Sequence, residues 1–486
     1  MTDPKFRPLS SNYNFVPRDV FQIHLMGICG TAMAALAGGL KELGYQVRGS
    51  DRNAYPPMGT FLKERGIPIL MGFAPQNLHP QPDLVVVGNV ITRDNPEVLE
   101  LAKLAIPFIS FPQALNYFVM KDSKRIVVAG THGKTTTSSL VAWLLHSSGV
   151  RSGFMIGGIP RNFDKGFSLA KGPYFVIEGD EYDTAFFDKG PKFFHYHPDK
   201  LILTSIEYDH ADIYASVEDI ITNFRKLVSL VPAQGHIIAN ADDPNVMDVI
   251  SEANCMVVTY GTDKGADFRL DSIEDQKAGR LLSIRTSSNR CLTMSTPVYG
   301  RHNLLNLTAT VALGSVMGLP ERDIAKAAAT FKGVKRRQET VGEERGILVL
   351  DDFAHHPTAV RETISAVKKA FPQRRLLAVF EPRSNSSRRN VFQREYARSF
   401  LDADLAMIPD PIMVARIPPE QRLSSTRLVE EINVNGTEAY HSADASGLLR
   451  LLLKKARAGD VVLFMSNGDF DNLPRRFLAA LKHCAN

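Results

Sequence analysis

Short runs of uninterrupted apolar residues recur along the chain from residue 21 onward, and segments with helical periodicity separate them. The clearest runs are FQIHLMG at 21–27, DLVVVGN at 83–89, RIVVAG at 125–130, YFVIEG at 174–179 and KLILTSI at 200–206. A strand is apolar at every position when helices cover both faces of its sheet, as they do in parallel sheets. The pattern therefore predicts an α/β fold built on parallel sheets.

The length of 486 residues favours about three domains. Polar segments at 121–124 and 333–337 are typical of joints between domains. After the second joint, a further series of strand-like runs alternates with helical segments and ends in a helix from about Leu473 to His483: GILVLDDF, RLLAVFEP, DLAMIPD and DVVLFMS. We expect three units of unequal size, covering residues 1–121, 122–332 and 333–486.

Composition limits the class of protein. Hydrophobic residues make up 44% and charged residues 22%, as in ordinary soluble proteins, and the net charge of +5 suits phosphorylated ligands better than nucleic acid. No run of signal-peptide or membrane-spanning length occurs, so we expect a cytoplasmic protein that binds neither membranes nor nucleic acids. Neither a zinc site nor a disulfide framework is indicated, because the cysteines lie far apart at Cys29, Cys255, Cys291 and Cys484.

The segment GTHGKTTT at 130–137 follows the apolar run at 125–129 and precedes a helix that we expect to end near Ser148. A strand, a glycine-rich turn and a helix in this order are the setting of a phosphate-binding loop. Backbone N–H groups would surround the phosphates, the Lys134 ammonium would reach the β and γ phosphates, and the Thr135 hydroxyl would bind Mg²⁺. The expected ATP-binding residues of this loop are Gly130, Thr131, His132, Gly133, Lys134, Thr135 and Thr136.

The match to the general loop pattern is incomplete, since Val128 stands where that pattern has its first glycine. An ordinary glycine turn with a solvated lysine is the alternative.

Carboxylates follow two of the predicted strands. The strand at 174–177 delivers Glu178 together with neighbouring acids, and the strand at 200–206 ends in EYDHAD, which contains His210. Ligands of parallel sheets lie at the carboxyl ends of strands, and Mg²⁺ prefers oxygen donors. We therefore select Glu178 and His210 as metal neighbours, with a solvated acidic loop as the alternative.

Three further segments offer nucleotide or substrate contacts. GRHNLLN opens a helix at which His302 could stack on a base and Asn303 or Asn306 could hydrogen-bond its edge, although Asn303 could instead cap the helix. DDFAHHP places Asp352 and His355 after a strand, where a ribose, an incoming substrate or, less favoured, a metal pair would meet them. Arg337 could oppose the transferring phosphate or lie on the surface.

In the C-terminal unit, the segment EPRSNSSR carries Arg383 and Arg388, whose guanidinium groups could bind a substrate carboxylate in bidentate fashion. An irregular polar loop is the alternative. At the other end of the chain, GICGTAM resembles a dinucleotide-binding turn with Asp51 placed for a ribose hydroxyl, but Cys29 and Ala32 replace two of its glycines. A nucleotide diphosphate at this turn remains the interpretation, with plain strand-to-helix packing as the alternative.

Taken together and in this order, these motifs resemble those of the Mur ligase family over nearly the whole chain. The resemblance implies a Rossmann-like N-terminal domain for a UDP-sugar, a central P-loop domain for ATP and a Rossmann-like C-terminal ligase domain. It implies a catalytic set of Lys134, Glu178, His210 and Arg337, with Mg²⁺ near Thr135, Glu178 and His210. The UDP-sugar residues would be Gly27, Ile28, Cys29, Gly30, Thr31, Ser50 and Asp51, and the peptide-substrate residues Arg383, Ser384, Asn385 and Arg388.

Two members of that family compete. One adds L-alanine to UDP-N-acetylmuramate, and the other adds the tripeptide L-alanyl-γ-D-glutamyl-meso-diaminopimelate to the same sugar nucleotide. The stretches EGDEYDTAFFDKGPKFFHYHP and FEPRSNSSRRN look like the second member. Some family members carry a carbamylated lysine about fourteen residues after the metal histidine, but Phe224 stands there, so no carbamate is expected. We expect a monomer or a weak homodimer.

Two other classes of function remain open from the residues themselves. A P-loop protein could hydrolyse ATP only to change shape, without forming a bond. A dehydrogenase would have to bind a nicotinamide cofactor through Gly27 and Asp51.

Overall fold

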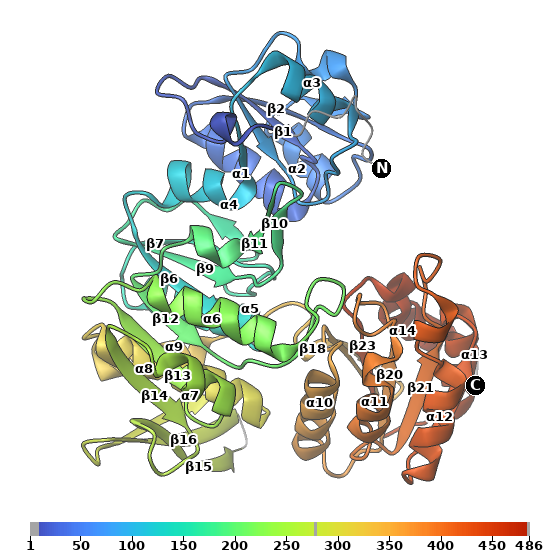
Figure 1. The fold of residues 1–486 in the computed structure, drawn as a ribbon. Helices are drawn as coiled ribbons and strands as arrows, with labels where there is room; N and C mark the ends of the chain where they lie inside the picture. Colours follow the sequence, from blue (N-terminus) through green and yellow to red (C-terminus); the bar gives the residue numbers. More distant parts are fainter. Residues whose placement is uncertain (1–8, 277–278, 484–486) are drawn as a thin grey trace.

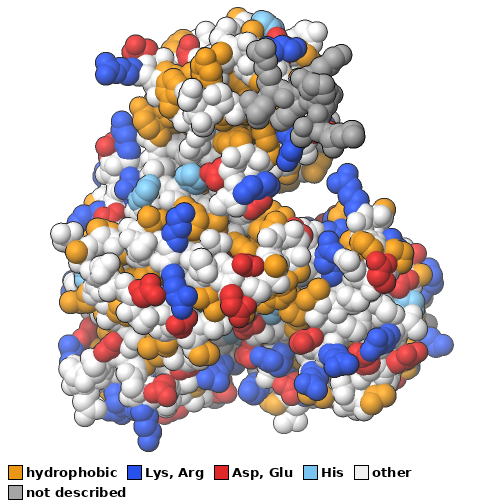
Figure 2. Space-filling model, in the orientation of Figure 1, with side chains coloured by type: hydrophobic (Ala, Val, Ile, Leu, Met, Phe, Trp, Pro, Cys, Tyr) orange, Lys and Arg blue, Asp and Glu red, His pale blue; other side chains and the backbone are white. Residues whose placement is uncertain are grey.

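The computed structural model describes residues 9–276 and 279–483, and the strands within them form three large sheets that follow one another along the chain (Figure 1). The N-terminal sheet lies at one end of the molecule, the central sheet lies next to it, and the C-terminal sheet lies beside the lower part of the central one. The outline is notched between the N-terminal and C-terminal parts (Figure 2). The α/β class is confirmed.

The N-terminal sheet is parallel, in the order β3-β2-β1-β4-β5. Its strands are β1 Gln22–Met26, β2 Gln46–Asp51, β3 Ile69–Met71, β4 Leu84–Val87 and β5 Phe108–Ser110. The associated helices are α1 Thr31–Glu42, α2 Met58–Glu64, α3 Pro96–Leu104 and α4 Phe111–Ala114, with the 3₁₀ turns η1 Ser11–Tyr13 and η2 Pro75–Leu78 and the π-helix η3 Leu115–Met120. This strand order is the one found in Rossmann-like sheets.

The central sheet has the order β17-β16-β15-β14-β13-β12-β6-β9-β7-β8. Its strands are β6 Lys124–Ala129, β7 Ser152–Met155, β8 Phe167–Ser168, β9 Tyr174–Gly179, β12 Lys200–Leu203, β13 His236–Asn240, β14 Met256–Gly261, β15 Phe268–Gln276, β16 Gly279–Thr286 and β17 Cys291–Thr296. A separate hairpin joins β10 Asp183–Ala185 to β11 Asp188–Pro191. The helices are α5 Lys134–Ser147, η4 Lys192–His195, α6 Val217–Ser229, α7 Pro244–Ile250, α8 Arg301–Val316 and α9 Glu321–Thr330.

The C-terminal sheet has the order β18-β19-β23-β20-β21-β22 and is parallel except for β18. Its strands are β18 Glu339–Glu344, β19 Ile347–Asp352, β20 Leu376–Phe380, β21 Leu405–Pro409, β22 Glu438–Ser442 and β23 Val461–Met465. The helices are α10 Pro357–Ala370, α11 Gln393–Ser399, α12 Ser425–Val434, α13 Ala445–Lys455 and α14 Leu473–His483, with the short turns η5 Asn390–Phe392, η6 Pro419–Gln421 and η7 Phe470–Asn472.

The apolar runs form the middle of each sheet because helices cover them on both sides. Ile126, Val127, Val128 and Ala129 of β6, for example, are fully buried. The parallel arrangement expected from the apolar runs holds in the middle of the sheets. At the edges of the central sheet, β15, β16 and β17 run antiparallel to one another and β8 pairs antiparallel with β7. The outer part of β15 reads SIEDQ and faces solvent, so it carries no continuous apolar run.

The first two domains pack through apolar side chains. One hydrophobic cluster includes Leu25 and Phe118 of the N-terminal part and Phe193 and Phe224 of the central part. A second contact places Phe187, beside the β10–β11 hairpin, edge-on against Phe108 at a centroid distance of 5.0 Å. The N-terminal and central domains therefore share a continuous hydrophobic interface.

Within residues 9–276 and 279–483, no helix is long and apolar enough to cross a membrane. In the same residues Cys29, Cys255 and Cys291 have free thiols, while Cys484 lies outside them.

Candidate active site

The phosphate loop connects β6 to α5 at the carboxyl end of the central sheet. Gly133 immediately precedes α5 with a φ of 80°, a left-handed conformation that favours glycine. A Cβ at this position would lie 2.6 Å from Oδ1 of Asn306, so the side chain of α8 leaves no room for one. The N-terminal N–H groups of α5 are left uncapped by any side chain of the described residues, which suits an anion.

The end of β12 and the residues after it hold this loop in place. The Thr204 hydroxyl donates to the backbone carbonyls of Ala129 and His132. The backbone N–H of His132 donates to Ser205 Oγ at 3.0 Å, and that of Glu207 donates to Thr131 Oγ1 at 2.9 Å. The segment that follows β12 thus holds the loop in its conformation through several hydrogen bonds.

Lys134 lies over its own loop. Its ammonium donates to the Gly130 carbonyl at 2.6 Å and to both Glu181 oxygens at 2.9 and 3.0 Å. Burial alone would lower the pKa of Lys134, but Glu181 and Asp180 together hold this pKa above its ordinary value. Lys134 therefore stays a cation inside the site. His210 Nε2 lies 3.4 Å from the other face of the same carboxylate, so Glu181 links Lys134 to His210.

His210 has a φ of 54°, which is uncommon outside glycine. Such backbone strain is retained where the surrounding structure fixes a side chain for a purpose. The neighbouring Asp209 is buried, and burial alone would raise its pKa, but the imidazoles of His210 and His355 hold the pKa well below its usual range.

Thr135, Glu178 and Arg337 meet at the start of α5. The Thr135 hydroxyl donates to Glu178 Oε2 at 3.2 Å, and Arg337 Nη2 donates to Thr135 Oγ1 at 3.3 Å. Burial raises the pKa of Glu178, against the opposing effect of a hydrogen bond from the Gly157 N–H. A buried carboxylate beside a hydroxyl is an oxygen-donor set that fits Mg²⁺, and a bound cation would relieve the cost of that buried charge. His210, as a nitrogen donor already bonded to Glu181, fits Mg²⁺ less well.

The start of α8 adjoins the loop, as Asn306 already showed. The Asn303 side chain donates to the Tyr299 carbonyl at 3.1 Å and to Gln338 Oε1 at 3.0 Å, so it links α8 to the segment that enters the C-terminal domain. Gly300 is the residue before the helix, so Asn303 is not its N-cap. Burial lowers the pKa of His302 to about 4 and keeps this imidazole neutral.

The C-terminal domain brings DDFAHHP against the central domain. Asp352 accepts hydrogen bonds from the backbone N–H groups of Gln338 and Ala354, each at 2.7 Å. It therefore holds the segment that connects the central and C-terminal domains. His355 Nδ1 donates to the Phe353 carbonyl at 3.0 Å, and His355 lines a cavity with Asp209 and His210. Thr358, near the start of α10, donates to Glu207 Oε2 at 2.7 Å.

A cluster of His132, Glu207 and His356 joins three elements, and one ligand atom from each lies within 4.8 Å of the others. The two imidazole rings lie 4.7 Å apart. His356 uses Nε2 toward the Tyr208 carbonyl at 3.1 Å and Nδ1 to accept the N–H of Thr358, which caps α10. Because both nitrogens of His356 already form hydrogen bonds, we interpret this cluster as a contact between the central and C-terminal domains rather than as a metal site. His132 places the contact at the phosphate loop.

The segment with Arg383 and Arg388 lines a cavity of about 340 Å³ between the central and C-terminal domains. Arg383 is paired with Asp469 and Ser384 with Ser387. Asn385 Nδ2 donates to Asp212 Oδ2 of the central domain at 2.8 Å. The cavity opens onto His210 and His355, which places it beside the phosphate loop and its acids.

The turn after β1, predicted to bind a nucleotide, is held by hydrogen bonds to the end of β2. The N–H groups of Gly27 and Ile28 donate to the Ser50 carbonyl, and the N–H of Cys29 donates to Asp51 Oδ2 at 2.9 Å. Asp51 thus orders the turn itself, a role that the sequence did not suggest. Gly30 precedes α1, which begins at Thr31.

Several residues of the site were not selected from the sequence. In the sequence, Glu181 is one of several acidic residues after the strand at 174–177, and nothing there distinguishes it. Its ion pair with Lys134 depends on the path of the chain after β9. Glu207 and Asp209 were likewise passed over in favour of His210. Phe224 is fully buried, and its ring packs against Phe193.

The fold and the loop define a multidomain α/β protein with a glycine-rich loop at the centre and a cavity formed where the second and third domains meet. Comparisons with known proteins agree with this class over nearly the whole length. Residues 22–121 match the model for the Mur ligase family catalytic domain, residues 128–314 that for the Mur ligase middle domain, and residues 336–468 that for the Mur ligase glutamate ligase domain.

Relatives cover the chain end to end. The chain is 38% identical over 466 residues, 95% of its length and 98% of the relative, to the UDP-N-acetylmuramate–L-alanyl-γ-D-glutamyl-meso-2,6-diaminoheptandioate ligase of Escherichia coli strain K12. It is 33% identical over 459 residues, 94% of its length and 97% of the relative, to the UDP-N-acetylmuramate–L-alanine ligase of Clostridium acetobutylicum. A crystal structure of a murein peptide ligase from Psychrobacter arcticus 273-4 superposes with a TM-score of 0.71 at 33% identity, covering 96% of this chain and all of the other.

The chain belongs to the Mur ligase family and is a ligase.

Proposed function

We propose that this protein uses ATP and Mg²⁺ to join the tripeptide L-alanyl-γ-D-glutamyl-meso-diaminopimelate to UDP-N-acetylmuramate, in the recycling of peptidoglycan. The observation that supports it most is the meeting of Lys134, Thr135, Glu178 and Arg337 at the phosphate loop, next to a cavity that only the third domain completes. The sugar nucleotide would lie at the turn of residues 27–31, with its lactyl carboxylate toward the ATP γ-phosphate.

In the proposed reaction, the lactyl carboxylate takes the γ-phosphoryl group from ATP, and the peptide amine then attacks the acyl phosphate and releases phosphate. Lys134 lies over the loop and Arg337 hydrogen-bonds to Thr135, so both cations are placed to stabilise charge on the transferring group. Mg²⁺ held by Thr135 and Glu178 would neutralise further charge on the phosphate oxygens. Docking of the third domain would exclude water, which otherwise hydrolyses the acyl phosphate.

The assignment of the tripeptide over L-alanine is supported by the comparisons and by the cavity. Two tripeptide ligases are 38% and 36% identical to the chain, whereas the L-alanine ligase of Clostridium acetobutylicum is 33% identical. A cavity of about 340 Å³ lined by Arg383 and Arg388 suits a ligand larger than alanine that carries several carboxylates.

The test compares the two acceptors with the same enzyme preparation. With UDP-N-acetylmuramate and Mg·ATP present, product formation measured by chromatography should have a kcat/KM at least 100-fold higher for the tripeptide than for L-alanine. A preference for alanine would assign the chain to the alanine-adding reaction instead.

Phosphate release measured in the same mixtures separates a ligase from an ATP-driven switch. Release should require the sugar nucleotide and the acceptor together. Equal release with ATP alone would favour the switch, and binding of a nicotinamide cofactor would favour the dehydrogenase.

We further propose that the protein works in the cytoplasm, where its nucleotide substrates are, as a monomer or a weak homodimer. The division into domains at 1–121, 122–332 and 333–486 stays a prediction. Gel filtration over a range of concentrations tests the oligomeric state, and limited proteolysis at the two joints tests the domain boundaries.

A further inference from the structure

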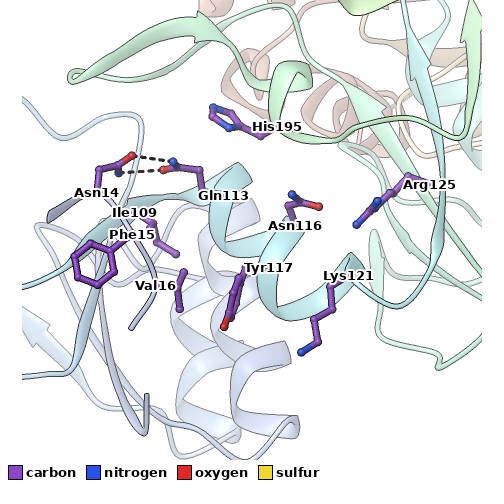
Figure 3. Close-up of a pocket in the computed structure, with 10 residues that line it drawn as sticks. All are labelled: Asn14, Phe15, Val16, Ile109, Gln113, Asn116, Tyr117, Lys121, Arg125 and His195. Atoms are coloured by element: carbon purple, nitrogen blue, oxygen red, sulfur yellow. Dashed lines mark hydrogen bonds between the residues drawn. The ribbon is translucent and has the colours of Figure 1, made fainter. Parts of the chain in front are cut away.

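A cavity of about 390 Å³ lies where the N-terminal domain meets the central domain, away from the phosphate loop (Figure 3). The N-terminal arm contributes Phe15, the π-helix η3 contributes Asn116 and Tyr117, and the connection into β6 contributes Lys121 and Arg125. The volume is in the range of sites for small organic molecules.

Two cations at this cavity have no acidic partner. Among residues 9–276 and 279–483, neither Lys121 nor the guanidinium of Arg125 forms an ion pair; Lys121 only approaches the Tyr117 ring, at 5.8 Å. The nearby Asp199 accepts the backbone N–H of Arg125 rather than its side chain. His195, also at the cavity, is already paired with Asp188 at 2.7 Å. The positive charge of the first two side chains is therefore free to meet an anion.

Two polar atoms at the cavity are buried without a hydrogen-bond partner in the described structure, namely Nε of Arg125 and Oδ1 of Asn116. Such atoms are rare in folded proteins, because each costs free energy unless something binds to it. Asn116 lies on the π-helix η3, and π-helical turns are frequent at functional sites. Nothing in the ligase reaction described above uses either residue.

The opposite wall is apolar. Figure 3 shows Phe15 and Val16 on one side of the cavity and Lys121 and Arg125 on the other. Phe15 is about half exposed, although it lies beside the hydrogen-bonded pair of Asn14 and Gln113. A ligand that satisfies both walls carries an anionic group at one end and a planar or apolar body at the other.

The cavity is remote from the reaction. Arg125 lies at the amino end of β6, and the phosphate loop follows its carboxyl end, so about five residues of extended chain, or roughly 16 Å, separate Arg125 from Gly130. In the N-terminal sheet, Ile109 of β5 lines the cavity, whereas the turn at residues 27–31 follows β1, two strands away.

We propose that this cavity is a second binding site, which takes a small organic anion with a planar or apolar body, such as an aromatic phosphate monoester. Lys121 and Arg125 bind the anionic group, Asn116 Oδ1 accepts a hydrogen bond from the hydroxyl that a singly protonated phosphate group carries, and Phe15 and Tyr117 cover the apolar body. Because both domains line the site, a bound ligand stabilises their contact.

Isothermal titration calorimetry with phenyl phosphate as the probe tests the proposal on the full chain, after saturation with ADP and UDP so that neither nucleotide site competes. Wild-type protein should bind one equivalent, and inorganic phosphate and phenol should each bind at least tenfold more weakly. The double variant Lys121→Met/Arg125→Gln should lose at least tenfold in affinity while it keeps wild-type ligase activity, which shows that it is folded.

The matched control Lys103→Met/Arg151→Gln removes the same charges from exposed positions outside the cavity and should bind phenyl phosphate as the wild type does. The proposal is overturned if the wild type shows no saturable binding, or if the cavity variant binds as well as the control. It is also overturned if binding occurs only without ADP and UDP, since the probe then occupies the active site. Equal binding of inorganic phosphate would refute the apolar half of the assignment.

Discussion

Gly133→Ala is the substitution whose effect the structure defines most sharply. Alanine in the left-handed conformation that Gly133 adopts costs about 1–2 kcal/mol. Its Cβ would also lie 2.6 Å from Oδ1 of Asn306, where ordinary contacts begin at 3.4 Å, so the loop or the amide must move by roughly 0.8 Å. Misplacement on the scale of 1 Å at a reacting group lowers rates by up to about 100-fold.

Gly149→Ala supplies the matched control. Gly149 has a φ of 75°, so alanine suffers the same backbone strain there, but no described atom lies within 4 Å of the added Cβ. Backbone strain should therefore cost each variant about 1–2 kcal/mol of stability, and Gly133→Ala should lose more because its Cβ also meets Asn306. Only Gly133→Ala should lower kcat/KM for ATP, by about 10- to 100-fold.

The assay combines thermal denaturation with steady-state phosphate release at varied ATP and saturating second substrates. The reasoning is refuted if Gly133→Ala keeps a wild-type kcat/KM for ATP while both variants melt at the same lowered temperature, because the loop would then bind no nucleotide.

Three other predictions follow from the same site. Lys134→Ala should abolish product formation, by about 100-fold or more, with the fold retained by circular dichroism; unchanged turnover would remove the phosphate loop from the reaction. Burial would raise the pKa of Glu207, but His132 and other partners lower this pKa to about 2 in the folded protein. The ionised Glu207 therefore stabilises the fold above its ordinary pKa near 4.5, and this stabilisation is lost as the pH falls toward 2. The stability difference between wild type and Glu207→Gln, measured by urea denaturation, should hence narrow from pH 6 to pH 3, and a constant difference would show that Glu207 makes no such contribution. Asn385→Ala breaks the contact with Asp212 and should raise the KM for the peptide several-fold with the KM for ATP unchanged; an equal rise in both would place Asn385 in general domain docking.

The sequence predicted the sheets well because helix-covered strands are apolar at every position. The run RIVVAG became β6, and the helix expected at 473–483 is α14. The antiparallel edge formed by β15, β16 and β17 escaped detection, since strands with one solvated face show a weaker pattern than buried ones.

The candidate site was predictable to the extent that it lies at strand ends. Lys134, Thr135 and Glu178 lie at or just after the carboxyl ends of β6 and β9, which the structure pairs as neighbouring parallel strands. The pairing of Lys134 with Glu181, and the contact of Glu207 with Thr358, depend on loop paths and on how the third domain docks. No local sequence pattern predicts these contacts.

The unequal packing of the domains has a kinetic consequence. Large apolar clusters join the first two domains. The third domain contacts the central one through a few aromatic rings, such as Tyr208 against Phe392, and through single polar pairs such as Asn385 with Asp212. The proposed sites for both nucleotides thus lie mainly in the first two domains, with Arg337 added to the ATP site by the third, while the proposed acceptor site exists only where the third domain is docked. Such an architecture implies ordered substrate binding in which the amine binds last. The acyl phosphate would then react with the amine before water can hydrolyse it.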